Sequence, residues 1–240
     1  MASLRDDFEA KSGYWDWRID GYASINVEDS VARLCTGPSE ALYYSNAEVS
    51  DGGFGGLRWR WARARFRARM TGLHYGSAGV GLWNYTMVVK DSVPVWFIYL
   101  RARGRYPLQG VFLQAGRRFV PVKLFSSVTL YYFLKILPPL APIRILSRRP
   151  LAQDLDPTEW HVYEVELRGG EAVFRLDGEE LARVRVPEAR RWRFRVDAWI
   201  DNAVYQPGRM DAGAVYRHVT QEVRERACLE LDWVEVEGEG

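Results

Sequence analysis

The sequence predicts an all-β protein, built as a two-sheet antiparallel β-sandwich. The chain has 240 residues, 14% of them aromatic, with 21 glycines, and it shows no long stretch of helical periodicity. Short runs of β-branched and aromatic residues recur between turn residues from Ala23 to Val236. This spacing is typical of sandwiches and not of alternating strands and helices. Because no internal repeat or flexible linker divides these runs, we expect one domain over residues 1–240.

The clearest local signal is a pair of strands within residues 160–176. Two runs in which apolar and polar residues alternate flank the turn Gly169-Gly170, and a second turn follows at Asp177-Gly178. This spacing predicts a meander of antiparallel strands.

This hairpin resembles the concanavalin A-like lectin and glucanase superfamily, in particular glycoside hydrolases of the laminarinase and lichenase type. In that family a Trp-His-x-Tyr strand, here starting at Trp160, precedes a strand that ends in Asp-Gly, here Asp177-Gly178. Three further segments fit the same template, namely residues 79–84, 199–202 and 229–236. The resemblance covers most of the chain outside about 101–153. It implies a jelly-roll sandwich that holds a saccharide in an aromatic-lined concave groove and requires no cofactor.

Residues 94–100 form the strand on which these hydrolases would carry their catalytic acids. Retaining glycosidases need two carboxyl groups about 5–5.5 Å apart, one as nucleophile and one as acid/base. The family places both on a single strand, in the pattern Glu-x-Asp-x-Glu or its bulged form, shortly before the Trp-His-x-Tyr strand. Here that strand reads Pro-Val-Trp-Phe-Ile-Tyr-Leu and has no acid. We therefore expect a lectin-like, non-catalytic relative of the hydrolases that binds a saccharide or another polyhydroxylated ligand.

The alternative is a glycoside hydrolase whose carboxylates have moved to another strand. Residues 230–235 match the bulged acid pattern, with Glu230 and Glu235 at its ends. They stand in the terminal strand, however, where we expect solvated side chains. Asp197 and Asp201 reproduce the spacing of the unbulged pattern, on a different strand and with shorter side chains. These four acids are the catalytic candidates, and none of them is convincing.

The strand around Trp199 offers the best ligand-binding face. Alternation separates an apolar face, expected in the core, from a polar face with Trp199 between Asp197 and Asp201. A tryptophan flanked by carboxylates is typical of a sugar subsite, because the ring stacks on the sugar while the carboxylates accept hydroxyl hydrogen bonds. Tyr99 is a substitute for Trp96, since alternation puts these two on opposite faces of their strand. The predicted ligand-binding residues are Trp83, Asn84, Trp96, Tyr99, Arg195, Asp197, Trp199 and Asp201.

An acid-free segment interrupts the resemblance. Residues 92–153 contain ten arginines and lysines and no Asp or Glu, and we expect a basic, apolar insertion at about 101–153. Within its most apolar part, residues 117–149, the apolar run is interrupted by Lys123, Lys135 and the prolines Pro138, Pro139 and Pro142, so it is not expected to span a membrane. Three roles stay open for it: a lid over the groove, a homodimer contact, or a surface lying on an anionic membrane. Nucleic acid is an unlikely partner, because no recognised binding module accompanies the basic run.

The two cysteines, Cys35 and Cys228, fall in the first and last strands of the expected sandwich. Such strands are neighbours in this kind of fold, so the geometry permits a disulfide. No secretory signal is visible at the N-terminus, which makes the cytoplasm the default location and favours two buried free thiols.

No spacing of cysteines and histidines predicts a zinc site or a nucleophilic triad, since His74, His161 and His218 are widely dispersed. The resemblance implies one structural calcium ion instead. Its ligands would be a carboxylate of the terminal strand, here Asp232, and backbone carbonyls near the first strand, because calcium prefers oxygen ligands.

Overall fold

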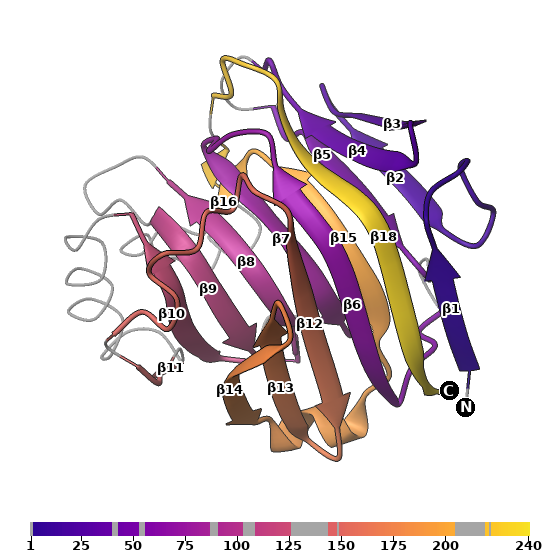
Figure 1. The fold of residues 1–240 in the computed structure, drawn as a ribbon, viewed down its shortest axis with the longest axis vertical. Helices are drawn as coiled ribbons and strands as arrows, with labels where there is room; N and C mark the ends of the chain where they lie inside the picture. The colour runs from indigo at the N-terminus through magenta and orange to yellow at the C-terminus, as the bar shows by residue number, and fades with distance from the viewer. Residues whose placement is uncertain are drawn as a thin grey trace.

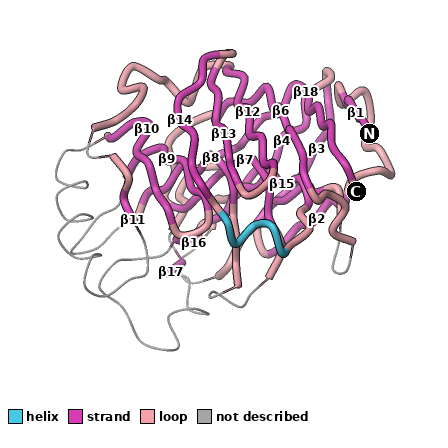
Figure 2. The backbone as a smooth tube through the Cα atoms, turned by 90° about the horizontal axis from the view of Figure 1, so that it is seen from below, coloured by secondary structure: helices cyan, strands magenta, loops and turns pink. Residues whose placement is uncertain are grey.

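The computed structural model describes residues 2–39, 43–52, 56–86, 91–102, 109–125, 144–147, 149–204, 219–220 and 222–240. Within them the chain forms two eight-stranded sheets, a two-stranded ribbon and one short 3-10 helix, η1 (Pro187–Arg191) (Figure 1). The two large sheets stack as the layers of a sandwich, and η1 lies at one end of it (Figure 2). The predicted all-β jelly-roll sandwich is confirmed.

Sheet A is built around its two longest strands, β6 (Trp61–Met70) and β18 (Ala227–Glu239). Its strand order is β14 (Glu179–Arg185), β13 (Glu171–Leu176), β12 (His161–Arg168), β6, β18, β4 (Val31–Thr36) and β3 (Ser24–Glu28), and β1 (Ala2–Asp6) also pairs with β18. Because Ala2 pairs with Gly238, the two ends of the chain lie side by side (Figure 1).

Sheet B contains the strands that carry most of the predicted ligand-binding residues. Its order is β11 (Arg144–Ile145), β10 (Arg118–Leu124), β9 (Gln109–Ala115), β8 (Val95–Arg101), β7 (Gly76–Trp83), β15 (Arg195–Asp201), β5 (Asn46–Ser50) and β2 (Asp16–Asp20). The ribbon pairs β16 (Ala203–Val204) with β17 (Val219–Thr220). In the described part of the chain the pairing is antiparallel everywhere except between β10 and β11.

The core lies between the sheets and follows from strict alternation along the strands. In β6 buried alanines, Phe66 and Met70 alternate with partly exposed residues, most of them arginines. Phe66 is fully buried, and truncating a phenylalanine in such a site costs about 3–5 kcal/mol of stability. A period of two in the sequence therefore sets which face of each strand enters the core.

The central strands of sheet B, β7, β8 and β15, are largely buried on both faces. All seven residues of β15 are buried, and a second apolar cluster that includes Ile98, Phe112, Phe119 and Trp199 lies on the face turned away from sheet A. A strand buried on both faces reads as a continuous apolar run. This explains why β8 contains no charged residue before Arg101.

The predicted insertion at 101–153 is wrong for much of its length. β9 and β10 are integral strands of sheet B, and β11 continues its edge. Residues 126–143, the most apolar part of the segment 117–149, lie outside the described residues. The lid, homodimer and membrane-surface roles therefore stay untested.

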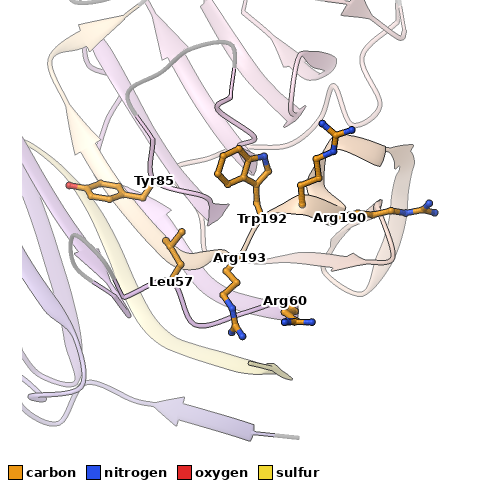
Figure 3. Close-up of a pocket in the computed structure, with 7 residues that line it drawn as sticks. Leu57, Arg60, Tyr85, Arg190, Trp192 and Arg193 are labelled. Carbon is orange, nitrogen blue, oxygen red and sulfur yellow. The ribbon is translucent and has the colours of Figure 1, made fainter.

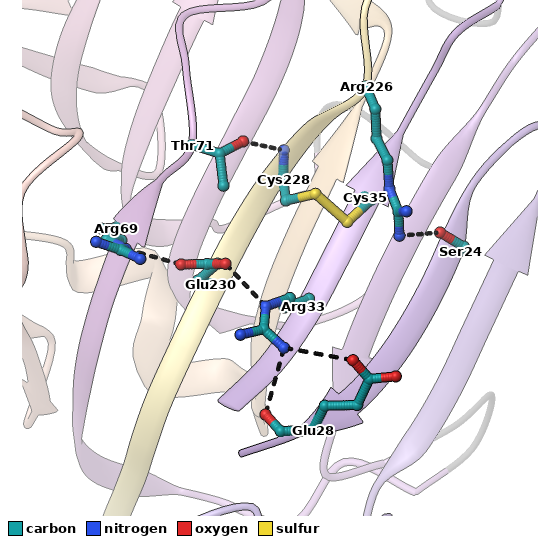
Figure 4. The surroundings of a disulfide bond; sticks show 9 residues. All are labelled: Ser24, Glu28, Arg33, Cys35, Arg69, Thr71, Arg226, Cys228 and Glu230. Carbon is teal, nitrogen blue, oxygen red and sulfur yellow. Dashed lines mark hydrogen bonds and ion pairs between the residues drawn. A yellow bond between two sulfur atoms is a disulfide. The ribbon is translucent and has the colours of Figure 1, made fainter. Parts of the chain in front are cut away.

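The prediction of two free thiols is also wrong. Cys35 and Cys228 form a disulfide between β4 and β18 (Figure 4). The two residues lie directly opposite each other in the antiparallel register, with 4.0 Å between their Cα atoms. Opposite positions on paired strands bring the side chains together, which is why the pairing forms.

No helix among the described residues is long and apolar enough to cross a membrane.

Candidate functional site

Three tryptophans lie together on the outer face of sheet B, which is the face turned away from sheet A. They come from three neighbouring strands, with Trp96 on β8, Trp83 at the end of β7 and Trp199 on β15. The ring centroids of Trp96 and Trp199 are 4.5 Å apart, and those of Trp83 and Trp96 are 5.8 Å apart. Tyr85, just beyond β7, meets the ring of Trp83 edge-on at 5.0 Å. We call these four side chains the aromatic row.

Two glycines of β7 make room for the rings. Gly79 pairs with Trp199, and Gly81 lies beside Trp96. A Cβ atom at Gly79 would lie 2.4 Å from Cη2 of Trp199, and one at Gly81 would lie 2.5 Å from Cβ of Trp96. Any side chain at either position would displace a ring or its strand, so the aromatic row depends on both glycines.

Protein acceptors hold all three indole N–H groups. The acceptors are Ser92 Oγ for Trp83, Gln114 Oε1 for Trp96 and Ser77 Oγ for Trp199, at 3.1, 2.9 and 3.2 Å. These bonds fix the ring planes and leave the ring faces and edges for a ligand. Trp83 and Trp96 are half-buried, whereas only 9% of Trp199 is exposed. Trp83 and Trp96 are therefore the better stacking surfaces, and Trp199 supports Trp96.

A buried charge cluster lies next to the aromatic row. Nη2 of Arg195 donates to Glu48 Oε1 at 2.5 Å and to Asp197 Oδ2 at 2.8 Å, and Nη1 donates to the carbonyl oxygen of Gly52 at 3.2 Å. The Arg195 guanidinium carbon lies 3.5 Å from the ring centroid of Tyr85. Arg195 and Asp197 are each 1% exposed and Glu48 is 7% exposed. One guanidinium thus donates hydrogen bonds to two carboxyl groups under an aromatic cover.

Burial raises the pKa of Asp197 well above its ordinary value, and the negative charge of Glu48 raises it further, while Arg195 opposes both. Among the described residues, Asp197 Oδ1 and Arg195 Nε have no hydrogen-bond partner. Buried polar atoms of this kind are commonly satisfied by ordered water. The cluster therefore has one acceptor and one donor left for a small polar group.

Asp201 lies on the far side of Trp199 from Asp197 and points away from it. Its Oδ1 accepts hydrogen bonds from the Ser77 backbone N–H and hydroxyl and from the Ala203 N–H, at 3.2, 2.9 and 2.9 Å. Burial raises its pKa to about 7. Since Asp197 turns toward Arg195 and Asp201 turns toward the other end of β15, the two carboxyl groups do not converge on one bond.

Two predicted ligand-binding residues lie elsewhere. Tyr99 is 3% exposed in the core between the sheets, where its hydroxyl donates to the carbonyl oxygen of His74 at 2.8 Å. The amide of Asn84 is used by the loop after β7, because it donates to the carbonyl of Asp91 and accepts from the N–H of Val93. Neither side chain reaches the aromatic row.

The acids of β18 lie on the outer face of sheet A, in the other layer of the sandwich. Glu230 binds both Arg33 and Arg69, Glu235 pairs with Arg65, and Asp232 pairs with Arg67. Glu235 is partly exposed, but Glu230 is only 5% exposed, so the expectation of a solvated side chain is wrong for Glu230. Because each of these three acids is paired with an arginine across the strands, none of them is a free carboxylate.

The calcium prediction at Asp232 stays a prediction. In the described part of the chain no three or more His, Cys, Asp and Glu side chains gather as a metal site would require. The carboxylate of Asp232 is held by the Arg67 guanidinium, which would compete with a cation.

Sequence reasoning missed two members of the site. Glu48 sits in a strand, Asn-Ala-Glu-Val-Ser, whose alternation does place Asn46, Glu48 and Ser50 on one polar face. This alternation indicates that Glu48 lies on a polar face. The pairing of Glu48 with Arg195, however, depends on the strand order of sheet B. Tyr85 lies outside any strand and has no periodic signal.

Comparison with known proteins settles the fold. No protein-family model matches the chain, and no curated protein matches it by sequence. A structure of an endo-acting O-glycanase from members of the human gut microbiota is similar over 99% of both chains, with a TM-score of 0.60 and 17% identity. The chain has a concanavalin A-like jelly-roll fold.

Two further structures agree with this concanavalin A-like fold. The laminarinase of Flavobacterium sp. UMI-01 gives a TM-score of 0.57 at 9% identity, covering 97% of this chain and 98% of the laminarinase. The κ-carrageenase of Pseudoalteromonas carrageenovora, in complex with an oligosaccharide, gives 0.56 at 10% identity, covering 97% and 92%. The resemblance predicted from the sequence is confirmed at the level of the fold.

Proposed function

We propose that the protein binds a saccharide chain on the outer face of sheet B and does not hydrolyse it. The observation that carries the proposal is the aromatic row beside the Arg195 cluster. Flat rings with fixed planes next to a few fixed polar groups are what a sugar ring requires, since its faces are apolar and its rim is polar. The fold shared with a laminarinase and with a carrageenase bound to an oligosaccharide supports the same ligand class.

The acids around the row argue against hydrolysis. β8 turns Trp96, Ile98 and Leu100 toward the outer face of sheet B, so this strand supplies no carboxylate there. Asp197 and Asp201 diverge, and Glu48 shares the Arg195 guanidinium with Asp197. A retaining glycosidase needs two carboxyl groups that face one glycosidic bond, one of them free to act as a nucleophile.

The test is a titration with soluble polysaccharides, followed by intrinsic tryptophan fluorescence and by release of reducing ends. We expect saturable binding without release. Trp96→Ala should weaken that binding by roughly tenfold or more, as loss of a central aromatic contact usually does. Trp233→Ala is the matched control, because Trp233 is also half-buried but lies on the outer face of sheet A beneath Arg5.

Binding that survives Trp96→Ala, or is lost equally in Trp233→Ala, would contradict the proposed location. Release of reducing ends that disappears in Asp197→Asn would instead favour a hydrolase with relocated acids.

A further inference from the structure

A basic pocket lies at one end of the aromatic row. It has a volume of about 650 Å³ and is lined by Leu57, Arg60, Tyr85 and the four residues Arg190 to Arg193 (Figure 3). These residues come from separate parts of the chain: the segment just before β6, the loop after β7, and η1 with the turn that follows it. In Figure 3 the Trp192 ring lies between Tyr85 and Arg190, while the Arg193 and Arg60 side chains extend below it.

The pocket is lined by four arginines and no acid. Within the described residues none of the four, Arg60, Arg190, Arg191 and Arg193, forms an ion pair. Arg190 donates to the carbonyl oxygen of Gly169, and Arg193 to that of Arg58. The nearest acid of η1, Glu188, is held by Arg118 at 2.5 Å. The pocket therefore carries positive charge that no carboxylate of the described residues neutralises.

The arginines on the outer face of sheet A are arranged differently. Arg65, Arg67 and Arg69 are half-buried and each is paired with a carboxylate of β18, whereas the four pocket arginines are exposed. Four arginines without carboxylate partners among the described residues line this pocket. Such a pocket suits an anionic ligand, because the planar guanidinium binds carboxylates and sulfates through paired hydrogen bonds.

The pocket is continuous with the proposed saccharide site through Tyr85. This ring lines the pocket, covers Arg195 and contacts Trp83. A chain lying on Trp96 and Trp83 would therefore reach the pocket at the Tyr85 end. Trp192 adds a second half-buried ring on the opposite side.

We propose that this arginine pocket binds an anionic substituent, a carboxylate or a sulfate, of a saccharide that lies along the aromatic row. The proposal rests on the saccharide binding proposed above and narrows its ligands to acidic glycans. The rings hold the sugar backbone, and the arginines select for the charge.

The experiment is a glycan array that carries neutral, uronic acid and sulfated chains together with single-stranded DNA. It compares the wild type with Arg60→Gln/Arg193→Gln and with Trp96→Ala. The control, Arg224→Gln/Arg226→Gln, also removes two positive charges, but just before Ala227, the first residue of β18. Arg60 lies at the opposite end of this strand, where its backbone N–H donates to the carbonyl oxygen of Glu239, the last residue of β18. A strand of 13 residues separates the two sites by about 40 Å.

We expect the wild type to prefer acidic chains. The pocket variant should lose about tenfold or more of acidic binding and keep its neutral binding, the size expected for losing charge-assisted hydrogen bonds. The control should match the wild type. Raising NaCl from about 0.1 M to about 1 M should abolish the preference, because the screening length falls from about 10 Å to about 3 Å. The uronic acid and sulfated arms report which anion fits better.

Neutral binding that needs Trp96 but shows no acidic preference would overturn the pocket and leave the proposed function standing. Binding to no glycan at all, or binding indifferent to Trp96→Ala, would remove the proposed function itself. Equal binding of single-stranded DNA and acidic glycans, or an equal loss in the control variant, would also overturn the arginine pocket.

Discussion

The outer faces of the two sheets use the same residue types in opposite ways. On sheet A, arginines of β6 pair with carboxylates of β18 in partial contact with solvent, and the side chain of Arg65 is 36% exposed. On sheet B, the side chain of Arg195 is 2% exposed and holds two carboxylates beneath Tyr85. Exposed ion pairs contribute little because water screens them, whereas a buried charge that loses its partner is costly. The outer face of sheet A is thus a solvated surface, whereas the Arg195 cluster of sheet B is held rigidly in place by burial.

The largest effect should come from Arg195→Met. This change leaves Glu48 and Asp197 buried side by side without their counter-charge. We expect a loss of about 3–5 kcal/mol in the free energy of unfolding, measured by urea denaturation at neutral pH. A loss below about 1 kcal/mol would show that water reaches the cluster and that the contrast between the faces is smaller than the burial indicates.

The next effect concerns the covalent link on sheet A. Replacing both Cys35 and Cys228 by alanine should remove about 2–5 kcal/mol of stability, because the bond closes a loop with a sequence separation of 193. Thiol titration of the unfolded wild type, without reductant, should find no free thiol. Finding two would restore the free-thiol prediction. Since disulfides persist in oxidising compartments, the bond argues against the default cytoplasmic location, which stays a prediction.

The buried acids of sheet B should also make stability depend on pH. The pKa of Asp201 is raised from 3.8 in the unfolded chain to about 7 in the folded protein, because the carboxyl group is buried. The folded state therefore holds this proton more tightly, and the resulting stability is full below about pH 4 and lost as pH rises through about 7. Asp201→Asn should remove that component, so the stability of the wild type relative to this variant should fall from pH 4 to pH 7.

Buried His74 acts in the opposite direction in an overlapping range. Burial lowers its pKa from 6.5 to about 4, so its contribution is lost as pH falls through this range. The pH profile of the wild type therefore sums opposite contributions, and buried Asp197, whose pKa is also raised, acts in the same direction as Asp201. A stability difference between Asp201→Asn and the wild type that stays constant from pH 4 to pH 7 would contradict the Asp201 assignment.

The smallest effect should follow removal of a surface pair on sheet A. Arg65→Ala and Glu235→Ala, singly and together, should give a coupling energy of about 0–1 kcal/mol in a double-mutant cycle. A coupling energy close to the stability loss expected for Arg195→Met would show that this ion pair on the outer face of sheet A stabilises the fold as much as the buried cluster does.

Local alternation made much of the fold predictable, together with the face of the strand on which each candidate site residue lies. Along β15 a period of two correctly separated the core residues from Arg195, Asp197 and Trp199. The same rule put Trp96 and Tyr99 on opposite faces of their strand, and the structure has Trp96 on the outer face and Tyr99 in the core. These inferences needed only the geometry of one strand.

The rest depends on which strands become neighbours. Glu48 joins Arg195 only because β5 pairs with β15, and Arg60 joins Arg193 across a large separation in the sequence. β9 and β10 were mistaken for an insertion, because strands buried on both faces lose the alternation that marks an ordinary sandwich strand. Single-sequence patterns hold no direct record of strand order.

The most direct test of the saccharide site is hydroxyl-radical footprinting, read by mass spectrometry, with and without a saturating polysaccharide from the binding screen. The account predicts protection of Trp83, Tyr85 and Trp96 and no change at Trp233 on sheet A. Unchanged oxidation along the aromatic row while the polysaccharide is bound, or protection confined to sheet A, would contradict it.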